Sequence, residues 1–356
     1  MNINASNVRN NLMTFALPKQ PPAEASTATA AVESAPLSRG EDSYDTGEGR
    51  FNDFPGRDGY DPNFLGEELP LPKLSPALRQ QAAPLLADPS KVELKYTNFS
   101  VVQHAQRATP MMTAVNIDGA QYQELERKGS WVFDGRIARE HQMGNEAYKN
   151  NDFDRGHLVR RKDAQWGSEA AKASGDTFVY TNAALQHSGL NQKSWLDLEN
   201  NIFFGAVANK EKKTVFTGPI LRDTDPSFDN NGRMKQATQI PTAFWKVQVW
   251  KDEKAGDLKA QAFVISQEDL ITGEAPQRPL PGTSPPPLKF YQVGMEQLEQ
   301  MTDIDFGSLT EADRTESDKK AIADAGIVLD DKPWLRKKKP AAAEPSPASS
   351  PPQPPG

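Results

Sequence analysis

The fold is decided by Asp154-Arg155-Gly156-His157 and by a second stretch that begins 34 residues after this tetrad ends, Asn191-Gln192-Lys193-Ser194-Trp195-Leu196-Asp197-Leu198-Glu199. The second stretch opens a helix predicted over 191–208, because its apolar residues recur at helical spacing. Asn191 therefore lies where the helix begins, and Glu199 follows two turns later on the same broad side. The sequence thus predicts one polar tetrad and one helix that presents two further polar side chains.

These residue types are the ones that metal-assisted phosphodiester hydrolysis needs: a base for water, a neutral oxygen ligand and a carboxylate for a hard cation, and a fixed positive charge for the phosphate. His157, one of four histidines, suits the base because an imidazole has an unperturbed pKa of about 6.5. Simpler interpretations stay open at this point. His157 could be a structural histidine, Asn191 could be only a helix N-cap, and Trp195 is interpreted as a core residue.

Composition favours one core with two weakly hydrophobic flanks within the 356 residues. Residues 18–48 are rich in Ala, Pro, Ser, Thr and Glu, and the chain from 337 is basic and then rich in Pro, Ala and Ser, so both flanks are predicted to be disordered. We divide the chain into a disordered N-terminal segment (1–48), an extended wrapping segment (49–92), a core domain (93–310), a C-terminal extension (311–336) and a Pro-rich disordered tail (337–356).

The chain has no cysteine, which excludes thiolate metal sites, cysteine nucleophiles and disulfides. We find no apolar stretch of signal-peptide length at the N-terminus and none near the roughly 20 residues of a membrane span. We therefore expect a protein that is cytoplasmic at synthesis, although export by a specialised secretion system would leave no sign of this kind. The net charge of −7 disfavours nucleic-acid binding as an average property of the surface. A local basic cluster still stands beside the tetrad, at Arg155, Arg160, Arg161 and Lys162.

The predicted elements are mixed in order, with several adjacent strands and few helices. This order is typical of an α+β fold around a mainly antiparallel sheet. We predict extended chain at 69–72, strands at 94–102, 112–117, 177–181, 214–217, 243–249 and 260–265, and helices at 168–174, 191–208 and 293–301.

The two stretches together resemble the DNA/RNA non-specific endonuclease family of the ββα-metal superfamily, which includes sugar-non-specific nucleases and mitochondrial endonuclease G. The resemblance covers roughly 96–306, and the pairing of the two motifs at this separation is highly specific. It implies a ββα-metal nuclease core within 93–310. It also implies a hydrolase that cuts both DNA and RNA, because a histidine base external to the substrate requires no 2′-hydroxyl, and contacts to phosphate and sugar carry little sequence information.

The resemblance also implies roles for individual residues. His157 resembles the general base, and Arg155 resembles a phosphate-contacting arginine. Asn191 resembles the one protein ligand of a magnesium ion, for which manganese can substitute, and Glu199 resembles the carboxylate that orients the metal-bound waters. A further family arginine lies upstream of the tetrad, where the candidates are Arg136 and Arg139, and we prefer Arg136.

Four residues are predicted to bind substrate or to support its binding. Asn182 and Gln186 match the polar positions of a family Asn-x-x-Pro-Gln element, whose proline is Leu185 here. Arg160 and Arg161 follow the tetrad where many relatives have Ala-Pro, and they either add phosphate contacts or are simply solvated. These departures concern the shape of the substrate groove rather than the chemistry.

Two alternative functions stay open. One is a nuclease toxin delivered by a specialised secretion system, for which an inhibitor or immunity protein would be a partner. The other is an inactive nucleic-acid-binding homologue. The oligomeric state is not predicted.

Overall fold

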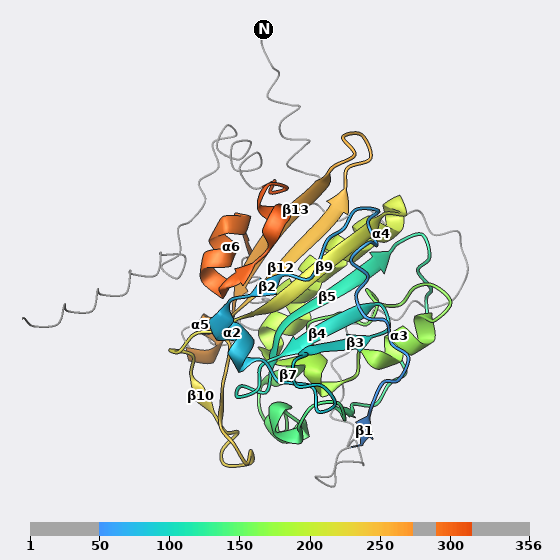
Figure 1. Ribbon diagram of the computed structural model, residues 1–356. Coiled ribbons are helices and arrows are strands. Elements are labelled where there is room, and N and C mark those ends of the chain that lie inside the picture. Colours follow the sequence, from blue (N-terminus) through green and yellow to red (C-terminus); the bar gives the residue numbers. More distant parts are fainter. Residues whose placement is uncertain (1–49, 273–289, 315–356) are drawn as a thin grey trace, which may run out of the picture.

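The computed structural model describes residues 50–272 and 290–314, so the predictions for 1–48 and 337–356 lie outside the described residues (Figure 1). Its centre is a seven-stranded antiparallel sheet with the strand order β14-β13-β12-β9-β5-β4-β3, which confirms the predicted fold class. The strands are β3 (Glu93–Tyr96), β4 (Phe99–Gln103), β5 (Pro110–Asp118), β9 (Lys212–Ile220), β12 (Ala243–Lys251), β13 (Leu258–Ser266) and β14 (Phe290–Val293).

Two predictions of strands need correction. The single strand expected at 94–102 is a hairpin of β3 and β4, because the chain turns at Asn98, whose φ of 69° lies in the left-handed region that asparagine tolerates. The buried strand expected at 177–181 is a 3₁₀ turn, Tyr180–Asn182, preceded by one parallel bridge between Val132 and Val179. That segment is buried as expected, but it is paired too little to be a strand.

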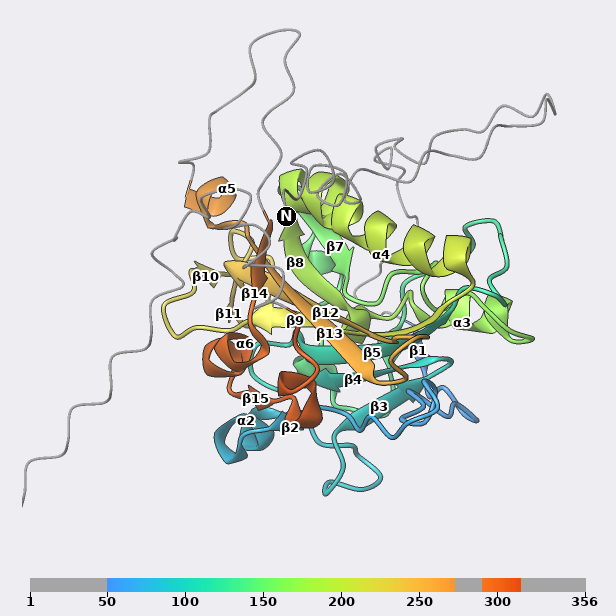
Figure 2. The ribbon, with the colours of Figure 1, turned by 90° about the horizontal axis from the view of Figure 1, so that it is seen from above.

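The sheet has a different layer on each face (Figure 2). Helix α4 (Leu196–Asn209) covers one face, and α6 (Met295–Thr302) covers the other together with the N-terminal segment. Because side chains alternate along a strand, Val115 and Val215 pack in the α4 core while their neighbours Ala114 and Phe216 pack in the α6 core. The remaining helices are α2 (Pro76–Gln81), α3 (Ala170–Asp176) and α5 (Glu268–Thr272).

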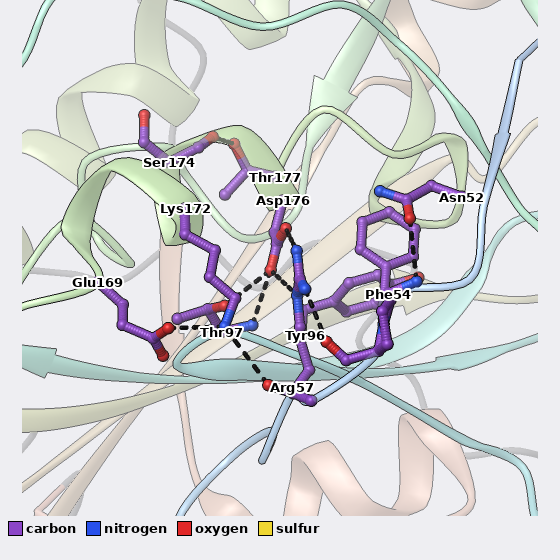
Figure 3. A network of polar contacts seen from close by, with 12 residues as sticks. Asn52, Phe54, Arg57, Tyr96, Thr97, Glu169, Lys172, Ser174, Asp176 and Thr177 are labelled. Atoms are coloured by element: carbon purple, nitrogen blue, oxygen red, sulfur yellow. Dashed lines mark hydrogen bonds and ion pairs between the residues drawn. The ribbon is translucent and has the colours of Figure 1, made fainter.

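The segment from 50 to 74 runs over the outside of the sheet and is fastened along its length (Figures 1 and 3). Arg57 donates to both oxygens of the buried Asp176 on α3, at 2.9 and 3.0 Å, and Thr97 donates to the same carboxylate at 2.8 Å from its hydroxyl. Short strands hold its two ends: β1 (Phe51–Asn52) pairs with β6 (Phe133–Asp134), and β2 (Lys73–Leu74) pairs with β15 (Ile304–Asp305). The side chains that it contributes to the core are Tyr60, Phe64, Leu65 and Leu69.

A second small sheet lies on the α4 side, formed by β7 (Phe153–His157) and β8 (Ala183–His187) in antiparallel register. A π-helical turn, Leu190–Trp195, follows β8 and continues directly into α4, so that two strands and a helix form the expected ββα unit. Trp195 is buried against Phe244 of the central sheet, as predicted for a core residue. Another two-stranded sheet is made of β10 (Ser227–Phe228) and β11 (Thr238–Gln239). Within the described ranges, no helix is both long and apolar enough to cross a membrane.

Candidate active site

His157 ends β7 and lies against aromatic rings. Its imidazole is 4.9 Å from the ring of Trp131 and meets the ring of Phe178 edge-on at 5.3 Å, measured between centroids. Burial, with a smaller effect from nearby arginines, lowers the pKa of His157 to about 3. The imidazole is therefore neutral at pH 7, and its buried Nε2 has no hydrogen-bond partner among the residues that the structure describes. The arrangement leaves a neutral base with one unpaired ring nitrogen.

Asn182 fixes the backbone that leaves His157. Its side-chain oxygen accepts from the amide of Val159 at 2.9 Å, and its amide donates to the carbonyl of the same residue at 3.0 Å and to that of Thr177 at 3.1 Å. Because Asn182 is completely buried, it supports the base and offers no surface to a substrate.

Gly156 is required by the side chain of Gln186, which lies across the hairpin from it. A Cβ at this glycine would stand 2.1 Å from Oε1 of Gln186, much closer than real Cβ contacts. Gln186 is itself fully buried, and neither of its polar atoms has a partner. Asn182 and Gln186 are thus both buried at or beside the strand pair that includes His157, and their part in binding substrate or in supporting its binding stays a prediction.

Asn191 lies inside the π-helical turn, so it is not the N-cap of a helix. Its amide nitrogen donates to Oδ2 of Asp154 at 2.9 Å, and the amide of Gln192 donates to the same oxygen at 2.9 Å. Since the nitrogen of Asn191 is used by Asp154, the other end of the amide, an oxygen, is turned away from that carboxylate. The two sequence motifs are joined by this contact.

The structure places arginines beside His157, but not the one preferred from the sequence. The guanidinium of Arg155 lies 5.3 Å from the ring of Trp131, and that of the exposed Arg127 lies 5.4 Å from the ring of Phe178. These are the two aromatic rings that contact His157. Arg127 was not among the candidates, since a single arginine in a polar loop carries no distinguishing pattern.

Both upstream candidates are engaged in ion pairs elsewhere. Arg136 binds the buried carboxylate of Asp134 at 2.6 Å and the carbonyl of Lys95 at 2.8 Å. Arg139 pairs with Glu146 at 2.9 Å. The expectation that Arg136 meets the phosphate therefore finds no support in its position, because its guanidinium is used to join β6 to β3.

The two arginines after the tetrad differ from each other. Arg161 is buried, and its guanidinium donates to Gln165 at 2.6 Å, so it is neither solvated nor open to a phosphate. Arg160 is half-buried: one nitrogen donates to Asn200 of α4 at 2.8 Å, whereas its Nη1 has no partner. Arg160 thus faces the interior below α4.

Glu199 projects from α4 into the interior and is only 7% exposed. Its Oε1 lies 3.6 Å from the ammonium of Lys246, a residue of the central strand β12. Burial raises the pKa of this glutamate, and Lys246 and Arg160 oppose that shift. The charge of Lys246 therefore acts on this carboxylate from slightly beyond hydrogen-bond distance.

Comparison with known proteins identifies a family that this chain matches. The sequence model of the DNA/RNA non-specific endonuclease family matches residues 83–313, most of the chain. The chain belongs to this family. The resemblance seen in the two motifs is thereby confirmed.

Individual relatives cover the chain less completely. An uncharacterised protein of Sinorhizobium fredii, y4fB, is 37% identical over 72% of this chain and 40% of its own length. Mitochondrial endonuclease G is 26% identical in Bos taurus and 28% in Homo sapiens, in each case over 49% of this chain and 54% of the relative. The chain thus spans about half the length, or less, of these curated relatives. A solved EndoG/EndoGI complex covers 64% of this chain and 89% of the matched one at 17% identity and a TM-score of 0.45.

The side chains of the candidate site could hold a metal ion through the amide oxygen of Asn191. Among the residues that the structure describes, no group of three or more His, Asp or Glu side chains could hold a metal. A site built from several protein carboxylates is therefore absent from that part of the chain. The amide oxygen of Asn191, oriented by Asp154, is a neutral oxygen donor, which suits a hard cation that keeps most of its waters.

Several residues that contact the candidate site residues were not singled out from the sequence. No separate role was assigned to Asp154 from the sequence, whereas its carboxylate accepts a hydrogen bond from the amide of Asn191. Trp131, which contacts both His157 and Arg155, precedes a strand and resembles any core aromatic in sequence. Lys246 could have been noticed, because a lysine in the middle of an apolar strand needs a buried partner.

Proposed function

We propose that this chain is a metal-dependent endonuclease that hydrolyses phosphodiester bonds in DNA and RNA with little sequence preference. The observation that carries the proposal is the contact between the two motifs. His157 is a neutral base with an unpaired nitrogen among the described residues. Asn191 is oriented by Asp154, which lies on the same strand as His157. Membership of the family supports the same reaction class.

In this proposal His157 accepts the proton of the attacking water at Nε2. Its low pKa keeps it unprotonated before the reaction, and burial beside Trp131 and Phe178 keeps its ring in one orientation. Arg155 and Arg127 add fixed positive charge next to those two rings, where the phosphate would gain negative charge.

Asn191 would hold a magnesium ion, or manganese in its place, through the side-chain oxygen. Bound there, the ion would supply charge neutralisation at the phosphate and at the leaving oxygen. Glu199 would orient the waters of that ion, and the half-buried Arg160 adds a positive charge beside this carboxylate. Nothing in this set requires a 2′-hydroxyl or reads a base edge, so both nucleic acids are substrates.

Plasmid nicking with Mg²⁺, with Mn²⁺ and with EDTA tests the proposal, with His157→Ala as the inactive control. Matched DNA and RNA oligonucleotides of several sequences are then digested at two salt concentrations. We expect cleavage of both, loss of cleavage in EDTA, and weaker binding at high salt because phosphate contacts release counterions. Cleavage that survives EDTA, or that is confined to one nucleic acid or one sequence, contradicts the proposal. Binding without nicking would identify an inactive homologue.

A further inference from the structure

Four ionisable side chains meet in the interior beneath α4. They are two acids and two bases, contributed by the chain after β7, by α4 and by the central strand β12: Arg160, Asp163, Glu199 and Lys246. Asp163 is 3% exposed and Lys246 is 1% exposed. Removing four such groups from water is costly, so their arrangement calls for a physical reason.

Lys246 lies at the centre of this group. Its ammonium donates to the hydroxyl of Thr217 on β9 at 3.0 Å, which fixes it to the sheet. The same nitrogen is 3.6 Å from Oε1 of Glu199 and 4.7 Å from the ring centroid of Trp195. Lys246 therefore lies near one buried side chain of α4 and one of the π-helical turn.

Several buried polar atoms at this place lack a hydrogen-bond partner within the described part of the chain. Of the twelve buried side-chain atoms that have no hydrogen-bond partner among the described residues, four lie at this place: Oε1 of Glu199, Oδ1 of Asp163, Nη1 of Arg160 and Nε1 of Trp195. Buried polar groups are ordinarily satisfied, and a purely structural ion pair is closed by short hydrogen bonds. Here the ammonium of Lys246 lies near Glu199, whose Oε1 is buried without a hydrogen-bond partner among the residues that the structure describes.

We propose that Lys246 is a positioning residue of the nuclease site: anchored on Thr217, its ammonium is the buried counter-ion that holds the Glu199 carboxylate charged and in place beneath α4. Asp163 is the second acid of the group and lies beside them. This inference rests on the proposed function, since it names what sets the state of one carboxylate in that site.

The electrostatics of the group support this division of charge. Burial raises the pKa of Glu199, and Lys246 is the foremost group that lowers it again, followed by Arg160. Burial also raises the pKa of Asp163, to about 7, and the charge of Glu199 adds to that shift. Burial lowers the pKa of Lys246, and Glu199 is the main group that opposes it. Without the ammonium, the largest influence that opposes burial would be lost, and the pKa of Glu199 would rise further.

The chain provides a matched control in Lys213 on β9. This lysine is also buried, at 9% exposure, and its ammonium lies 3.7 Å from Glu211 and 5.8 Å from the ring centroid of Trp250. It repeats the chemistry of Lys246 without touching Glu199. Lys213→Met should therefore reproduce any general cost of removing a buried lysine.

The first readout needs no activity. Infrared difference spectra of the metal-free proteins at pH 7 compare the protonated carboxyl band of wild type with that of Lys246→Met. We expect a new band that disappears when Glu199→Gln is added, and no such band in Lys246→Arg or Lys213→Met. If Lys246→Met does not fold, Lys246→Gln is judged by the same band. Absence of a Glu199-dependent band in the folded variant overturns the proposal.

The second readout is the pH–rate profile of plasmid nicking. In Lys246→Met the acidic limb should move up by at least about one pH unit, a tenfold loss of rate per unit within that limb. Lys246→Arg should retain the wild-type profile, and Lys213→Met should leave it unmoved. A uniform loss of rate with no change in profile contradicts positioning. If wild type itself does not nick, the proposed function fails, whereas the infrared result still decides the role of Lys246.

Discussion

One oxygen of Asp154 accepts hydrogen bonds from two side-chain amides, that of Asn191 and that of Gln192, both at 2.9 Å. The acceptor belongs to β7 and the donors to the π-helical turn, so one carboxylate links the strand that ends in His157 to the beginning of the site helix. Only the nitrogen end of an amide can donate, and the contact with Asp154 therefore decides which end of Asn191 faces outward.

Asp154→Ala should release Asn191 and weaken metal binding by about 10- to 100-fold, the usual effect of removing a group that orients a ligand. Calorimetric titration of the free protein with Mg²⁺ measures this directly. Asp197→Ala is the control, because Asp197 is an exposed acid in the first turn of α4. Equal Mg²⁺ affinity in wild type and Asp154→Ala would show that Asn191 is not the ligand or does not depend on Asp154.

His157→Ala should leave the fold and nucleic-acid binding nearly unchanged and should lower turnover by about two or more orders of magnitude, as expected for loss of a general base. The comparison variant is His187→Ala, at the end of the partner strand, whose ring nitrogen only accepts from the amide of Gly189. Nicking rates of the purified proteins decide the point. A His157→Ala variant that keeps more than about a tenth of the wild-type rate would exclude this residue as the base.

Gly156→Ala should destabilise the protein by roughly 1–3 kcal/mol, because the new methyl group would overlap the side chain of Gln186. Gln186→Ala removes the side chain that the new methyl group would overlap. The double variant should therefore lose clearly less stability than the sum of the two single variants, which denaturant unfolding measures. Additive losses would mean that Gly156 is needed for another reason.

The melting temperature of Asp163→Asn at different pH values tests how burial below α4 affects the ionisation of Asp163. Burial raises the pKa of Asp163 from 3.8 to about 7, so the folded protein binds this proton more tightly than the unfolded chain. The aspartate's contribution to stability is thus fully present below about pH 4 and is lost as the pH rises to about 7. Asp163→Asn should melt near the wild-type temperature at pH 4 and above it at pH 8. A variant that is less stable than wild type at pH 8 would show that Asp163 is needed as a charged group.

Removal of residues 1–48 and 340–356 should leave a folded and active protein, because the composition of these flanks provides too little apolar surface to build a core. Thermal unfolding and nicking by the shortened chain measure the outcome. Loss of solubility or activity would show that one of the flanks contributes structure.

The sequence carried the fold class and the family because those depend on strong local patterns. Strands β5, β9, β12 and β13 appeared as apolar runs, and α4 appeared through its apolar spacing. The β7–β8 hairpin did not, since β7 is composed of the polar tetrad and β8 is almost wholly buried, so neither alternates in the way that marks a surface strand. These two strands are recognised only by their pairing in the folded chain and not by their composition.

The candidate site was predictable at the motif and not beyond it. His157, Arg155, Asn191 and Glu199 stand in two short stretches whose spacing is informative. Partners such as Arg127 and Lys246 come from distant parts of the chain and are selected by tertiary packing. The sequence cannot distinguish Arg136 from Arg127, because only the fold shows that the first is bound to Asp134.

The contacts that the segment 50–74 makes with the core indicate where a fragment must begin in order to fold on its own. The family match starts at residue 83, whereas Arg57, Tyr60 and Phe64 precede it and lie on or within the core. A fragment trimmed to the match would uncover an aromatic face of the sheet and would leave Asp176 without its cation. The smallest soluble recombinant form of this protein should therefore start near residue 50, more than thirty residues ahead of the boundary that homology alone would suggest.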